Sequence, residues 1–105
     1  MLRDWKMSRD LFLITAFVMM NVERGRIVEV PDELLKIGSV TEVYSVAGDY
    51  DLIAIVRAKE ADELANIVTH QFSKVPGITK TKTQIAFACF SNYDLEHIFE
   101  IGPTP

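Results

Sequence analysis

The hydrophobic residues of this chain recur with two different periods, which predict strands and helices in turn. Residues 11–20 are bulky and apolar on both faces, as expected of a strand that is covered from two sides. Residues 40–46 and 52–56 are rich in β-branched side chains and predict two further strands that are joined by a tight turn. Residues 78–90 predict a fourth strand, longer than the usual strand of about five or six residues. Part of this strand is therefore expected to pair with another subunit.

Two amphipathic helices are predicted between these strands. The first has apolar residues at helical spacing and a glycine at its expected C-cap: Ile27, Val30, Leu34, Ile37 and Gly38. Pro31 either kinks this helix or marks its first turn, because inside a helix a proline removes a backbone donor and clashes with the preceding turn. The second helix has the same spacing at Ala61, Leu64, Val68, Phe72 and Val75.

The order of these elements predicts an α+β fold of the ferredoxin-like type, βαββαβ. A short internal similarity supports two similar halves, since KIGSVT at residues 36–41 resembles KVPGIT at residues 74–79. Such a fold has an antiparallel sheet with both helices on one face. The other face would expose apolar side chains of the first strand, which is unusual in a monomer. We therefore expect a dimer that packs sheet on sheet into an α/β barrel.

The two ends of the chain differ in character from its middle. Residues 1–10 are taken as an N-terminal extension and residues 11–105 as a single domain. Basic residues followed by ten apolar ones imitate a secretory signal, but Asp4 and Asp10 dilute the basic region and no small-residue cleavage site follows. At the other end a short terminal helix is predicted from a capping-box-like pair and an apolar face: Ser91, Asp94, Leu95, Ile98 and Phe99.

Composition narrows the possible functions. Of 105 residues, 49% are hydrophobic and 25% are charged, which is typical of one globular unit. The net charge of −4 and the scattered lysines and arginines argue against autonomous DNA binding, which depends on phosphate neutralisation. The single cysteine, Cys89, lies in an apolar run and is interpreted as a buried core thiol of a cytoplasmic protein. We expect no metal, disulfide or cofactor, because neither His70 nor His97 belongs to a ligand motif.

Two motifs carry a resemblance to a known family. EVYSVAGDYDL at residues 42–52 ends a strand in Gly-x-Tyr-Asp, and PGITKTKT at residues 76–83 is a Pro-Gly turn that leads into a Thr-x-Thr strand. Together they are similar to the effector-binding domain of the Lrp/AsnC (leucine-responsive) transcription regulators, over residues 11–90. The family's regulators have a helix-turn-helix domain ahead of this module, whereas here only ten residues precede the first strand. The chain therefore resembles the free-standing form, and the YDLEHIF segment at residues 93–99 resembles tails of that form.

The resemblance implies a ligand site for a small molecule, of amino-acid type. Its residues would be Gly48, Asp49, Tyr50, Asp51, Thr81 and Thr83. A zwitterion needs an acceptor for its ammonium group and donors for its carboxylate, which Asp51 and the amides around Gly48 would supply together with the threonine hydroxyls. Because a turn cannot enclose a ligand alone, the site is expected between dimers, with the turn from one chain and the threonines from another. The structural alternative is a solvated turn with ordinary sheet threonines.

Three functions remain open at this point. The first is a regulatory module, not an enzyme, that binds an effector, forms homodimers or higher oligomers, and partners with full-length Lrp/AsnC-type regulators but not with membranes or nucleic acid. The second is a dimeric ferredoxin-like enzyme of the small monooxygenase type. An enzyme of this kind would need polar groups in a cavity whose predicted lining is apolar. The third is an oligomerisation scaffold that binds no ligand.

Overall fold

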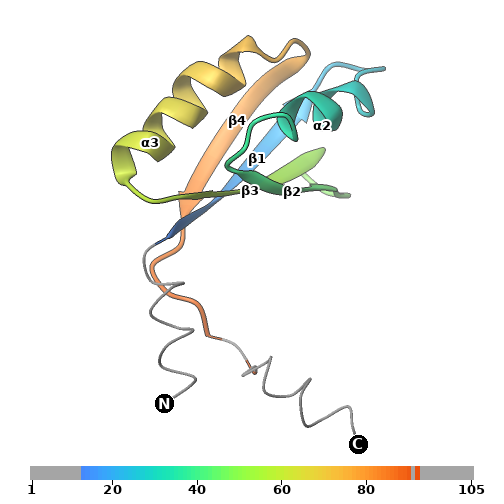
Figure 1. The fold of residues 1–105 in the computed structure, drawn as a ribbon. Coiled ribbons are helices and arrows are strands. Elements are labelled where there is room, and N and C mark those ends of the chain that lie inside the picture. Colours follow the sequence, from blue (N-terminus) through green and yellow to red (C-terminus); the bar gives the residue numbers. More distant parts are fainter. Residues whose placement is uncertain (1–12, 91, 93–105) are drawn as a thin grey trace, which may run out of the picture.

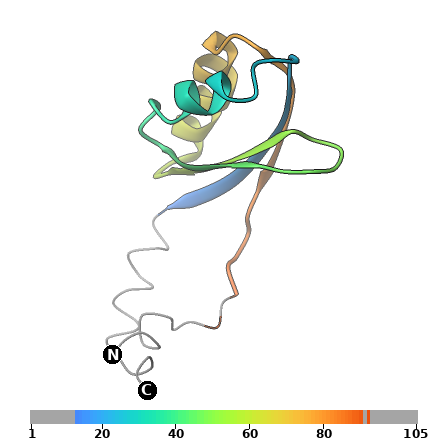
Figure 2. The same ribbon diagram turned by 90° about the vertical axis from the view of Figure 1, so that its right-hand side faces the viewer.

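The computed structural model describes residues 13–90 and residue 92, and within them the predicted ferredoxin-like fold is confirmed. The elements in chain order are β1 (Ile14–Val22), α2 (Glu29–Leu34), β2 (Val40–Ser45), β3 (Leu52–Ala58), α3 (Ala61–Asn66) and β4 (Ile78–Ile85). A π-helical turn (Ile67–Gln71) and a 3-10 turn (Phe72–Lys74) continue α3, and residues 61–74 together are called the second helix. The four strands form one antiparallel sheet in the order β2-β3-β1-β4. Both helices cover the same face of this sheet (Figures 1 and 2).

The core lies between the helices and the two central strands. Alternate residues of β1 and β3 point toward the helices and are fully buried, in keeping with the two-residue period of a strand: Ala16, Val18, Met20, Leu52, Ala54 and Val56. The helical segments bury Val30, Leu34, Leu64, Ile67 and Phe72 against them. Phe72 is the largest of these fully buried side chains. The helical periodicity was correct for Val30, Leu34, Leu64 and Phe72. It was wrong for Ile27 and Ala61, which are exposed, and it missed Ile67, which is buried. Ile27 precedes α2, so the predicted helix began too early.

Helix α2 is shorter than the predicted helix, and its proline lies in the first turn. Pro31 is the third residue of Glu29–Leu34, where backbone N–H groups have no partner within the helix, so the missing donor costs nothing. The carbonyl of Pro31 still accepts the Leu35 N–H at 3.0 Å. The prediction of a C-cap at Gly38 was wrong, because the helix ends at Leu34 with Leu35 as its C-cap, and Gly38 does not have a positive φ.

Strand β4 ends earlier than residue 90. Its last contact with β1 is the Ala86 N–H, which donates to the Thr15 carbonyl at 2.9 Å. Residues 86–90 continue without a strand partner in the described part of the chain, and Phe87 and Phe90 are fully exposed. The interpretation of Cys89 as a buried core thiol was wrong for this chain, because it lies in this uncovered segment and is exposed.

One face of the sheet is turned away from the helices and is called the open face. It is apolar at its centre and polar at its edges. One row across the strands runs Tyr44, Ile53, Met19 and Lys82, and the next runs Glu42, Ile55, Phe17 and Gln84. In both rows the central strands β1 and β3 carry the apolar side chains. Phe17 is 38% exposed although it belongs to a central strand.

Several sequence predictions lie outside the described residues. These are the N-terminal extension 1–10, the first two residues of the predicted first strand, the terminal helix and His97. Among the residues that are described, no helix is long and apolar enough to cross a membrane.

Candidate ligand-binding site

The turn between β2 and β3 contains four of the six predicted site residues. It is closed by a hydrogen bond from the Val46 N–H to the Asp51 carbonyl, at 3.0 Å. Gly48 has a φ of +140°, in the region that favours glycine, and a Cβ placed there would meet no atom within 4 Å. The requirement for glycine is therefore conformational. Gly48 and Asp49 are exposed, so this end of the turn is accessible to a ligand.

Asp51 anchors the turn to the neighbouring strand β1. Its backbone N–H donates to the Met20 carbonyl at 2.9 Å, and its Oδ2 accepts the Val22 N–H at 3.0 Å in a partly buried position. Its other carboxylate oxygen has no hydrogen bond within the described part of the chain. A carboxylate can accept about four hydrogen bonds, so this anchoring contact leaves capacity for a ligand ammonium group. Asp51 is thus a structural residue of the sheet as well as a candidate ligand contact.

Tyr50 brings the turn close to strand β4. Lys80 Nζ lies 5.8 Å from the centroid of the Tyr50 ring, near the outer limit of a cation–π contact. Lys80 was not among the predicted site residues. Lys80 and Lys82 are two residues apart and so share one strand face, but the sequence contains no indication that this face meets the turn.

Thr81 and Thr83 lie on the opposite face of the sheet from Lys80. Their register partners in β1 are Met20 and Val18, whose side chains point toward the helices. Both threonines are nevertheless exposed, because they lie on an edge strand. Met20 also pairs with Leu52, so Thr81 stands two strand spacings, roughly 10 Å, from the residue that follows the turn.

The six predicted residues therefore form two separate groups within one chain. The turn group projects from the end of the β2–β3 hairpin, and the threonine group lies along the edge strand (Figure 1). None of these six residues belongs to the lining of the groove between α2 and the second helix. Within one chain the turn group and the threonine group do not meet, and a site that takes them from two different chains stays a prediction.

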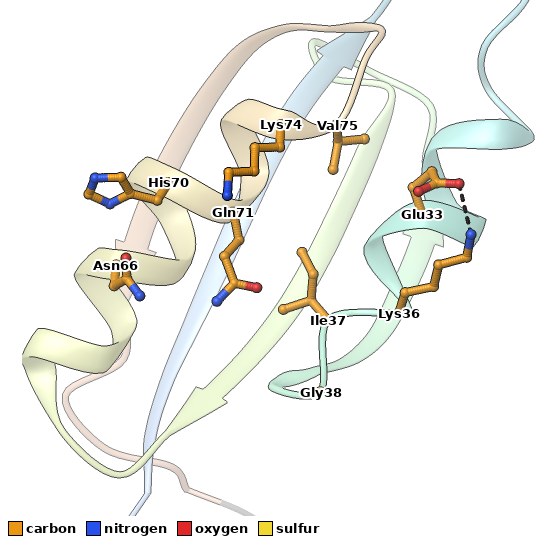
Figure 3. Close-up of a pocket in the computed structure, with 9 residues that line it drawn as sticks. All are labelled: Glu33, Lys36, Ile37, Gly38, Asn66, His70, Gln71, Lys74 and Val75. Carbon is orange, nitrogen blue, oxygen red and sulfur yellow. Dashed lines mark hydrogen bonds and ion pairs between the residues drawn. The ribbon is translucent and has the colours of Figure 1, made fainter.

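The structure also contains a groove that the sequence did not indicate. It has a volume of about 590 Å³ and lies between α2 and the long second helix, on the helix side of the sheet (Figure 3). Ile37 and Val75 give it an apolar surface, and Asn66, Gln71 and Lys74 line its other wall. His70, an exposed residue of this helix, also lines the groove.

The open face has a polar cluster at its β2 edge. The Tyr44 hydroxyl donates to Glu42 Oε1 at 3.0 Å, and Arg57 Nη1 donates to Thr41 Oγ1 at 2.8 Å. The hydrogen bond to Glu42, and then the negative charge of that carboxylate, raise the pKa of Tyr44 above its ordinary value. Within the described residues, no three His, Cys, Asp or Glu side chains are grouped so as to hold a metal ion.

Comparison with known proteins agrees with this architecture. The family model described as the Lrp/AsnC ligand binding domain matches residues 15–93. The chain belongs to the Lrp/AsnC family. The HTH-type transcriptional regulator FL11 of Pyrococcus horikoshii is 34% identical to it over 74 residues, which are 70% of this chain and 48% of that regulator. The chain thus spans about half the length of the curated Lrp/AsnC relatives it matches.

Two solved structures of this fold are informative. TTHA0845 of Thermus thermophilus is 37% identical, with a TM-score of 0.70, and the match covers 75% of this chain and 99% of that one. The transcriptional regulator NMB0573 of Neisseria meningitidis, solved as an L-Met complex, has a TM-score of 0.67 over 86% of this chain and 62% of that one. At 12% identity, the likeness to NMB0573 shows the fold alone.

Proposed function

We propose that this protein is a regulatory module of transcription control that binds an amino acid between subunits and has no catalytic role. The observation that carries this proposal is the Asp51 carboxylate. It is fixed by the Val22 N–H through one oxygen, and its other oxygen stands at an accessible turn without a partner in residues 13–90. A fixed carboxylate of this kind is a suitable acceptor for a ligand ammonium group. Membership of a ligand-binding family, and the L-Met complex of NMB0573, support an amino acid as the ligand class.

The second part of the proposal is a dimer formed by two open faces. An apolar centre with a polar rim is the usual anatomy of a protein interface. Here Phe17, Met19, Ile53 and Ile55 supply the centre, and Glu42 and Lys82 lie on the rim. Two such faces related by a twofold axis would form a sheet-on-sheet core and leave both the turn and the groove accessible. In the cytoplasm the same surfaces would let the module assemble with related DNA-binding regulators.

The ligand proposal is tested by a thermal-shift screen against the common amino acids, followed by calorimetry. An amino acid that binds only the folded protein raises its stability by mass action, by about 2.7 kcal/mol at a hundredfold excess over Kd. The key variant is Asp51→Asn, which keeps a hydrogen-bond acceptor for Val22 but removes the charge. Loss of a charge-assisted contact should weaken binding roughly 10- to 100-fold.

The matched control for this experiment is Asp62→Asn, which makes the same change at an exposed position of α3, outside the proposed site. It should leave the affinity unchanged. Equal weakening by both variants would show that only the net charge of the protein matters. If none of the amino acids stabilises the wild type, or if Asp51→Asn binds as well as the wild type, the proposed site is wrong.

The dimer is tested by sedimentation at micromolar concentration. The wild type should sediment as a dimer or a larger oligomer, and Phe17→Glu should give monomers, because it places a charge at the apolar centre of the open face. A control at the exposed turn, Asp49→Asn, should not change the sedimentation. A wild-type protein that is monomeric under these conditions would exclude the sheet-on-sheet dimer.

A further inference from the structure

The groove between the two helices has a local backbone feature that an ordinary helix lacks. Within the second helix, residues Ile67–Gln71 form a π-helical turn, and the Phe72 N–H donates to the Ile67 carbonyl five residues before it. π-helical turns are rare in proteins and occur frequently at functional sites. This one forms a wall of the groove.

The π-helical turn changes which side chain enters the groove. In an uninterrupted α-helix, residues four apart share a face, so His70 would stand in line between Asn66 and Lys74. With one turn closing over five residues, Gln71 takes that place. Figure 3 shows the Gln71 side chain directed toward Ile37 across the groove, whereas the His70 ring points away from it. His70 and Gln71 both line the groove, but the Gln71 amide is the group that points across it.

One hydroxyl group within the π-helical turn and one just after it donate hydrogen bonds to backbone carbonyls of this helix. Thr69 Oγ1 donates to the Ala65 carbonyl at 2.7 Å, and Ser73 Oγ donates to the His70 carbonyl at 2.7 Å. The π-helical turn is therefore supported by its own sequence and does not depend on a ligand to satisfy these groups. This support also means that the wall is already formed before anything binds.

The groove presents hydrogen-bond donors that lack protein partners. Within residues 13–90, the side-chain amides of Asn66 and Gln71 make no hydrogen bond, although Gln71 is half-buried. Lys74 on the same wall makes no ion pair with a described residue, whereas Lys36 across the groove is paired with Glu33 at 3.0 Å. Among the described residues, Lys74 thus adds a cation without an ion-pair partner beside the two amide donors.

These observations lead to one ligand class. We propose that the groove is a second binding site, for a small organic carboxylate. The carboxylate would accept hydrogen bonds from Lys74, Gln71 and Asn66, since a charged acceptor makes the strongest use of such donors. The apolar part of the ligand would pack on Ile37 and Val75, which lie next to these donors in the same groove. A volume of about 590 Å³ falls within the usual range of small-molecule sites.

This site is independent of the proposed amino-acid site. It contains no residue of the β2–β3 turn and neither threonine. It also lies on the helix side of the sheet, away from the open face that a dimer would bury. A ligand can therefore occupy the groove in a monomer, in a dimer, or beside an amino acid bound elsewhere.

The test is a titration of the ¹⁵N-labelled full chain with hexanoate, followed by NMR. The side-chain NH₂ signals of Asn66 and Gln71 report directly on the groove and should shift in a saturable way. Lys74→Gln should raise the Kd for hexanoate roughly tenfold, the effect of losing a charge-assisted hydrogen bond. The matched control is Lys82→Gln, the same charge change on the open face of β4, which should leave this Kd unchanged.

Three results would overturn the proposal. The first is the absence of saturable shifts at Asn66 and Gln71 with hexanoate. The second is an equal loss of affinity in Lys74→Gln and Lys82→Gln, which would indicate attraction by net charge alone. The third is binding of inorganic phosphate or of uncharged hexanamide at the same signals as tightly as hexanoate, which would remove the carboxylate assignment. Asp51→Asn should leave hexanoate binding intact, so failure of the amino-acid site and failure of this site are distinguishable.

Discussion

The hydrogen bond between Asp51 and the Val22 N–H leads to a prediction about stability. Asp51→Ala removes the acceptor from a partly buried backbone donor. Hydrogen bonds to charged groups contribute about 1.5 to 3 kcal/mol, and an unsatisfied buried donor loses its solvation as well. Because this position is only partly buried, water can replace some of the contact. We therefore expect the lower end, a loss of about 1.5 kcal/mol in the free energy of unfolding.

This loss is measurable by circular dichroism. For a domain of this size, each kcal/mol shifts Tm by about 4 to 8 °C, so Asp51→Ala should unfold roughly 6 to 12 °C below the wild type. All proteins should be compared at one concentration, because dimerisation makes Tm depend on concentration. Asp49→Ala is the matched control, since Asp49 is exposed and a surface change of this kind stays within about 0.5 kcal/mol.

A second variant separates the two roles of Asp51. Asp51→Asn retains an acceptor for the Val22 N–H but loses the charge, so it should be less destabilising than Asp51→Ala while binding an amino acid as weakly. If Asp51→Ala is no more destabilising than Asp49→Ala, the contact with Val22 does not stabilise the sheet. The carboxylate would then be free to serve the ligand alone.

Three further predictions concern other positions. Gly48→Ala should lower the free energy of unfolding by about 1 kcal/mol, because Gly48 has a positive φ. Gly38→Ala should be neutral or slightly stabilising, because Gly38 has an ordinary φ and open space around a Cβ. Urea unfolding distinguishes the two variants. Phe72→Ala should cost about 3 to 5 kcal/mol by leaving a core cavity, while the exposed Val28→Ala should cost little, again by urea unfolding. The purified chain should show no micromolar affinity for duplex DNA at physiological salt, because its net charge is −4; a mobility-shift assay is sufficient, and salt-sensitive binding would contradict this.

The sequence predicted the fold well because both of its periodicities have a direct physical cause. Val18, Met20, Leu52 and Val56 are buried because they alternate on strands that are covered by helices. Pro31 was correctly recognised as a possible first-turn residue, since that is where its missing donor is harmless. These are local rules, and they need no knowledge of which segments meet in space.

Predictions failed where the outcome depended on what covers a segment. Cys89 and its neighbours are apolar enough for a core, yet nothing in the described chain packs on them. The π-helical turn at Ile67–Gln71 was not predicted, because Leu64, Val68 and Phe72 fit an ordinary helical spacing of four. The structure instead buries Ile67 and Phe72, which are five residues apart. The distance between Asp51 and Thr81 within one chain depends on strand register, which the sequence pattern does not specify.

The strand order also determines when the chain can fold during synthesis. β1 is the first strand to be made, but its two neighbours in the sheet, β3 and β4, come later, and the last of these pairs Ile85 with Ala16. Nearly the whole domain must therefore leave the ribosome before β1 has a partner on each side. Contacts between such distant segments form slowly, and an unpaired apolar strand is prone to aggregate meanwhile. The nascent chain is thus most vulnerable at β1, the strand that lies at the centre of the finished sheet.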